Sequence, residues 1–100
     1  MSERPNPLKI LAVCGMGMGT SLILSMTTET AAARLGIPCK VSYTDLSSAK
    51  GQDVDVIVGQ QMHVDELVGE APVTVVIDDF VDDQALEDRL RRALADQGWL

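Results

Sequence analysis

The chain has 100 residues, of which 46% are hydrophobic and 23% are charged, as is typical of a single globular domain. Its 15 acidic and 8 basic residues give a net charge of −7, which argues against nucleic acid and anionic membranes as partners, because both attract clustered positive charge. No apolar run approaches the roughly 20 residues that cross a bilayer, so we expect no direct membrane insertion.

The first strand is expected at residues 8–13. The preceding residues 1–7 contain two prolines and no apolar core of a signal peptide, and we interpret them as a flexible arm ahead of a single domain over residues 8–100. Residues 8–13 are almost continuously apolar, which is typical of a central parallel strand covered on both faces.

A long helix is expected after a glycine-rich loop. Thr20 or Ser21 is predicted to cap this helix, and the helix is predicted to end near Leu35, because Gly36 suits a helix C-terminus and Pro38 prevents continuation. The residues expected on its buried face are Leu22, Ile23, Met26, Thr30, Ala33 and Leu35.

The rest of the chain alternates between strand and helix patterns. Strands are predicted at residues 39–44, 54–58 and 73–77, and helical segments at residues 46–50, within 60–70, and from about 82 to 98. This alternation predicts a small doubly wound α/β domain with a four-stranded parallel sheet in the order 2-1-3-4 and helices on both faces. The second strand, with one wetter face, is expected at an edge.

The loop between the first strand and the first helix has the composition of an anion site. Its glycines let backbone N–H groups turn toward a small anion, and the following helix adds its free N–H groups and positive dipole end. In such folds the ligand crevice lies beyond the carboxyl ends of the strands. We therefore predict that Cys14, at the mouth of the loop, carries a phosphoryl group. The candidate phosphate-binding residues are Gly15, Met16, Gly17, Met18, Gly19, Thr20 and Ser21.

Three known glycine-loop patterns do not fit this segment. A dinucleotide GxGxxG pattern starting at Gly15 needs a glycine where Thr20 stands, and a P-loop needs a lysine that the loop lacks. The tyrosine-phosphatase pattern C-x5-R-[ST] also meets Thr20 in place of its arginine. Without a guanidinium to stabilise transfer to water, we expect the loop to accept a phosphoryl group but to hydrolyse it poorly.

The segment from Ile10 to Ser21 resembles the start of the IIB components of the bacterial sugar phosphotransferase system, most of all the ascorbate type within the lactose, cellobiose and galactitol-like group. The CxxGxGxS-like pattern of the family is matched by Cys14, Gly17, Gly19 and Ser21. The resemblance implies a transferase in which Cys14 accepts a phosphoryl group from a phosphohistidine on a IIA partner. It also implies that the group passes to a sugar, with ascorbate as a candidate, bound by the IIC membrane transporter.

Two other functions stay open at this point: a cysteine-dependent phosphatase-like enzyme and a non-catalytic anion-binding module. The two cysteines are too few for a disulfide framework, which indicates a reducing cytoplasm, and Cys39 is interpreted as structural. The sequence has no CxxC pair and no Cys/His cluster with metal spacing, so we expect no metal and no cofactor.

Several side chains are expected near the loop because they follow the third and fourth strands, and these are Gln60, Gln61, His63 and Asp78. His63 is interpreted either as a solvated loop histidine or as a group that bonds a phosphoryl oxygen or tunes Cys14. Charge repulsion argues against phosphate contact by Asp78. Met16 and Met18 are candidates for contact with a partner, since exposed methionines make adaptable docking surfaces.

Overall fold

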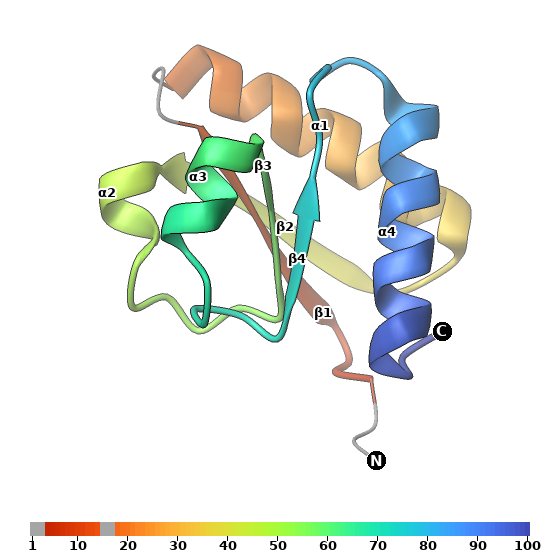
Figure 1. Ribbon diagram of the computed structural model, residues 1–100. Helices are drawn as coiled ribbons and strands as arrows, with labels where there is room; N and C mark the ends of the chain where they lie inside the picture. The colour runs from red at the N-terminus through yellow and green to blue at the C-terminus, as the bar shows by residue number, and fades with distance from the viewer. Residues whose placement is uncertain (1–3, 15–17) are drawn as a thin grey trace.

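The strand order is the one that the sequence pattern predicts. The structure is a computed structural model that describes residues 4–14 and 18–100, and its four parallel strands lie in the order β2-β1-β3-β4 (Figure 1). The elements in chain order are β1 (Leu8–Cys14), α1 (Met18–Leu35), β2 (Cys39–Asp45), α2 (Leu46–Ala49), β3 (Val56–Gly59), α3 (Gln61–Glu66), β4 (Val73–Val76) and α4 (Asp83–Gln97).

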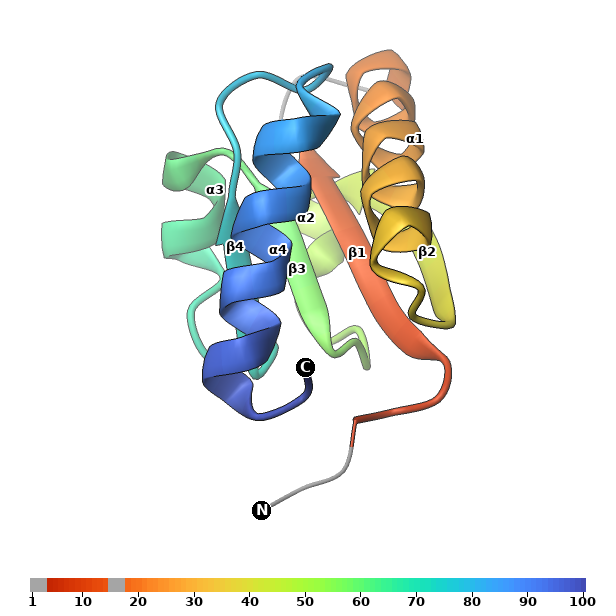
Figure 2. The same ribbon diagram turned by 90° about the vertical axis from the view of Figure 1, so that its right-hand side faces the viewer.

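The central strand β1 is covered on both faces, as its apolar run predicts. Every residue of β1 except Lys9 is buried, and the strand pairs with β2 on one side and β3 on the other. Helices α1 and α4 cover one face of the sheet, and α2 and α3 cover the other (Figures 1 and 2). Side chains of β1 alternate between the faces, so Ile10 packs in the core under α1 and α4 while Leu11 packs with α2.

The edge strand β2 and the termini of the helices also follow local sequence signals. β2 alternates between half-buried and exposed residues along most of its length, as predicted for an edge. The side chain of Asp45 accepts a hydrogen bond from Ser48 N and caps α2. Asp82 caps α4 in the same way through Ala85 N, and Gly98 ends that helix with a φ of 85°, a value that favours glycine.

The buried face predicted for α1 is wrong in most of its members. The residues of that set that lie at the surface are Leu22, Ile23, Met26, Thr30 and Ala33. The helix buries Leu24 and the polar Thr28 completely instead, and only Leu35 of the predicted set packs against the core. Thr28 can be buried because its hydroxyl donates to the carbonyl oxygen of Leu24 at 2.7 Å, which meets its hydrogen-bond requirement within the helix.

Candidate active site

The carboxyl ends of the strands come together at one edge of the sheet. The β1–β2 register places Cys14 beside Asp45, and the β1–β3 register places Val13 beside Gly59. Beyond β4, Ile77 N donates to Gly59 O at 2.9 Å. The segments that follow all four strands therefore start from this edge, which is where ligands bind in open parallel sheets.

Cys14 is the last residue of β1, and it is more deeply placed than the sequence suggests. Its side chain is only 1% exposed, whereas we expected a thiol at the mouth of the loop. β1 extends one residue further than predicted, and Cys14 still pairs with Asp45 of β2 at this last position. Gly15, Met16 and Gly17 lie outside the described residues, so their predicted phosphate contacts stay predictions.

The remaining loop residues belong to the first turn of α1. The helix begins at Met18, so Thr20 and Ser21 lie inside it, and the prediction that either caps it is wrong. Thr20 is half-buried. The side chains of Met18 and Ser21, and the surroundings of Gly19, are outside what the structure describes. The backbone of these residues contributes N–H groups at the N-terminus of a helix that directly follows the Cys14 loop.

Gly59 allows β1 and β3 to approach closely beside Cys14. A Cβ atom at this position would lie 2.9 Å from the carbonyl oxygen of Val13, and 3.7 Å from Cγ2 of Val64 in α3. The first contact is too short for a real side chain, and the atom met is backbone. The sequence pattern predicts only that the third strand ends at residue 58, just before Gly59. The sequence feature that indicates this close approach of the two strands is a glycine within a buried parallel strand.

His63 lies in a helix and is buried, so its interpretation as a solvated loop histidine is wrong. It is the third residue of α3 and is 8% exposed. Its Nδ1 atom is inaccessible to solvent and has no hydrogen-bond partner among the described residues. An unsatisfied buried polar atom of this kind costs about 1–3 kcal/mol, so it calls for an explanation. Of the other predicted neighbours, Gln60 precedes α3, while Gln61 and Asp78 are exposed.

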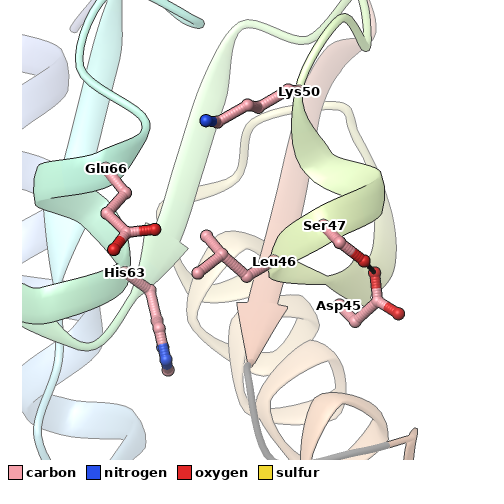
Figure 3. Close-up of a pocket in the computed structure, with 6 residues that line it drawn as sticks. All are labelled: Asp45, Leu46, Ser47, Lys50, His63 and Glu66. Atoms are coloured by element: carbon pink, nitrogen blue, oxygen red, sulfur yellow. Dashed lines mark hydrogen bonds between the residues drawn. The ribbon is translucent and has the colours of Figure 1, made fainter.

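A pocket of about 660 Å³ opens between α2 and α3 on the side of the sheet that these helices cover (Figure 3). The residues that line it are Asp45, Leu46, Ser47, Lys50, His63 and Glu66. Sequence reasoning identified His63 alone as a site residue. Asp45 ends β2, and the others lie in or directly after the helices that follow β2 and β3, which is the signal that could have identified them.

The pocket carries charges of both signs. Lys50 reaches into it from the end of α2 and Glu66 from α3 (Figure 3). Asp45 is held in place, because its Oδ1 accepts hydrogen bonds from Ser48 N at 2.8 Å and from the Ser47 hydroxyl at 3.1 Å. These bonds from Ser48 and Ser47 stabilise the carboxylate and lower the pKa of Asp45. The pocket thus offers both donors and acceptors to a polar group.

The lowered pKa of Asp45 predicts a pH-dependent contribution to stability. A carboxyl group with a lower pKa in the folded state stabilises the protein above its ordinary pKa of about 4, and this stability is lost as the pH falls through the folded-state value. We expect Asp45→Asn, which keeps a capping oxygen but does not titrate, to lower the urea midpoint at neutral pH and to match the wild type in acid. Ser47→Ala, which removes one of the two hydrogen bonds to Asp45, should lose part of the difference in urea midpoint between neutral and acidic pH. If the urea midpoints of the wild type and Asp45→Asn change with pH in parallel, this account is contradicted.

Within the described ranges, no three His, Cys, Asp or Glu side chains gather as they would around a metal ion. None of the helices in those ranges has the length and apolar character of a membrane span.

Cys39, at the start of β2, lies at the opposite end of the sheet from Cys14, and burial raises the pKa of its thiol. Of the two cysteines, Cys14 is therefore the one that lies at the carboxyl edge of the sheet.

Two comparisons with known proteins identify what the chain is similar to. A family described as "PTS system, Lactose/Cellobiose specific IIB subunit" matches residues 9–95. The chain is also similar to the "Ascorbate-specific PTS system EIIB component" of Mycoplasma pneumoniae, with 28% identity over 90 residues. That similarity covers 87% of this chain and 95% of the relative. The resemblance noted from the segment Ile10 to Ser21 is thus confirmed over most of the length.

Proposed function

The chain belongs to the family of lactose/cellobiose-specific IIB subunits of the phosphotransferase system, and from this premise we propose that it carries a phosphoryl group on Cys14. Family membership gives the chain a phosphoryl-transfer role in sugar transport. In the proposed relay the donor is a phosphohistidine of a IIA protein, and the acceptor is a sugar bound by the IIC transporter. The relay operates in the cytoplasm, where thiols stay reduced. The observation that carries the proposal is the position of Cys14 at the end of the central strand, one loop ahead of α1.

The proposed chemistry is nucleophilic catalysis in two steps. The Cys14 thiolate attacks phosphorus, the S–P bond forms as the N–P bond of the donor breaks, and the imidazole nitrogen keeps the electron pair. A sugar hydroxyl then attacks, the O–P bond forms as the S–P bond breaks, and the hydroxyl proton is released. Backbone N–H groups of residues 15–21 and the hydroxyls of Thr20 and Ser21 are proposed to hold the phosphoryl oxygens, aided by the N-terminus of α1.

Exposed apolar side chains beside the loop support docking of the donor there. Leu22, Ile23 and Met26 lie in the first turns of α1 and are 45%, 46% and 59% exposed. Single exposed apolar residues are ordinary, but these are close together on the helix that begins at the proposed phosphorylation site. We propose that the phosphorylated IIA protein contacts this part of α1 as its histidine approaches Cys14, together with Met16 and Met18.

Ascorbate is the sugar that we propose as acceptor. The support is the name and the coverage of the Mycoplasma pneumoniae relative, which is ascorbate-specific and aligned over 95% of its length. The family description names lactose and cellobiose, so these sugars provide the comparison. With membrane vesicles that contain the matching IIC transporter, the phosphorylated protein should lose its phosphoryl group to ascorbate and not to cellobiose.

Mass spectrometry after incubation with a phosphorylated IIA donor tests the carrier function directly. We expect the mass to rise by one phosphoryl group and fragmentation to place that group on Cys14, under neutral conditions that preserve phosphothiols. A protein that stays unmodified, or that is modified elsewhere, would contradict the proposal.

Hydrolysis of a phosphate ester separates the carrier from the phosphatase alternative. Because Thr20 occupies the position of the arginine that promotes transfer to water, we expect no release of p-nitrophenol from p-nitrophenyl phosphate above the background rate. Turnover of this ester that depends on Cys14 would favour the phosphatase instead.

A further inference from the structure

His63 is a buried titratable side chain that the proposed carrier chemistry does not yet use. It is 8% exposed, and the solvent-inaccessible Nδ1 has no hydrogen-bond partner in the described part of the chain. The apolar Val64 and Leu67 of the same segment are buried too, and an apolar residue at position 63 would avoid the cost of an unsatisfied nitrogen. A group that supplies a hydrogen-bond acceptor during function would explain the histidine.

The orientation of His63 indicates where such a group would be. In Figure 3 its side chain extends in the direction in which the arrows of β1 and β3 point, toward the carboxyl edge of the sheet. The register places Gly59, where β3 ends, beside Val13, the residue before Cys14. His63 also lines the same pocket as Asp45, which is the β2 partner of Cys14. Asp45, the partner of Cys14 on β2, thus lines the pocket that holds His63, and Gly59, the partner of the preceding residue Val13, ends the strand that leads to His63.

From this arrangement we infer that His63 donates a hydrogen bond from Nδ1 to an oxygen of the phosphoryl group on Cys14. The inference rests on the proposed function. Phosphoryl oxygens are strong acceptors, and a donor fixed in a buried position costs little reorganisation when the group arrives. The charges that line the pocket with His63 are Lys50, Glu66 and Asp45. The Oδ1 atom of Asp45 already accepts hydrogen bonds from the Ser47 hydroxyl and from Ser48 N, and not from Nδ1 of His63.

Replacement of His63 by apolar and by amide side chains tests the inference. We expect His63→Leu to remain folded, because the site is buried, and to slow phosphoryl transfer from the IIA donor to Cys14 by about 10- to 100-fold, the loss of one hydrogen bond to a charged group. His63→Asn, whose amide nitrogen comes near the position of Nδ1, should recover most of the rate. His63→Phe provides a second apolar variant of larger volume. Met62→Ala, on an exposed neighbour in α3, is the matched control and should transfer at the wild-type rate.

Two readouts distinguish this role from a structural one. The ³¹P chemical shift of the phosphocysteine should move in His63→Leu and stay near the wild-type value in Met62→Ala. The urea midpoint of each variant reports whether it folds. A folded His63→Leu or His63→Phe protein with the wild-type transfer rate and ³¹P shift would overturn the inference and leave the carrier function intact. Wild-type protein that takes no phosphoryl group on Cys14 would instead overturn the proposed function.

Discussion

Replacement of Cys14 by serine is expected to abolish phosphorylation by a IIA donor, with a loss of transfer rate on the order of a thousandfold or more. Serine differs from cysteine by one atom and fits the same buried position at the end of β1, so the fold should be preserved. A serine hydroxyl is a far weaker nucleophile at neutral pH than a thiolate. The measurement is single-turnover transfer from labelled IIA, followed by intact mass.

The second cysteine provides the matched control for this experiment. Cys39 is half-buried at the opposite end of the sheet, and burial raises the pKa of its thiol. Cys39→Ser should therefore accept the phosphoryl group at the wild-type rate. If Cys14→Ser is still phosphorylated at a rate near that of the wild type, or if the loss appears in Cys39→Ser, Cys14 is not the carrier residue. Noncovalent binding of the donor to Cys14→Ser should persist while covalent transfer is lost. A module that only binds anions would show binding without covalent transfer in the wild type as well.

The sheet could be predicted from the sequence because its signals are local. The run Leu8–Cys14 is apolar on both faces apart from Lys9, which is typical of a central parallel strand. Asp45, Asp82 and Gly98 stand at helix ends where their side chains or backbone freedom satisfy unpaired groups. Alternation of strands and helices then leaves few topologies, and the order 2-1-3-4 is one of them.

The faces of α1 could not be predicted by the same reasoning. Apolar and small polar residues occur all around this helix, so periodicity does not distinguish its sides. Thr28 is buried through a hydrogen bond within the helix, while Leu22 and Met26 are exposed near the helix N-terminus. A threonine can occupy either environment, and only the packing of α1 on α4 and the sheet decides between them.

The depth of His63 and the crowding at Gly59 depend on contacts between elements. A histidine three residues into a short predicted helix has no sequence signal that separates a buried ring from a solvated one. The requirement for glycine at position 59 comes from the carbonyl oxygen of Val13, which is far away along the chain. Such constraints appear only when the strands are placed in register.

Gly59→Ala is expected to lower the free energy of unfolding by about 1–3 kcal/mol, the usual cost of overpacking a core. The added Cβ atom would lie 2.9 Å from the carbonyl oxygen of Val13, and backbone in the middle of a sheet cannot yield as the end of a flexible side chain can. Movement of Val13 would also displace Cys14, the next residue. We therefore expect phosphoryl transfer to slow under conditions in which the variant is still folded. Urea denaturation and single-turnover transfer, measured on the same sample, test both effects.

Two further variants identify the cause of that loss. Gln60→Ala, at the next residue, removes a half-exposed side chain that makes no capping hydrogen bond, so its free energy of unfolding should stay within about 0.5 kcal/mol of the wild type. Adding Val64→Ala to Gly59→Ala should not restore stability, because the Cβ atom would lie at an ordinary 3.7 Å from Val64 and the short contact is with backbone. Restored stability in the double variant would place the crowding in α3. Full stability and transfer in Gly59→Ala would show that the spacing of β1 and β3 does not position Cys14.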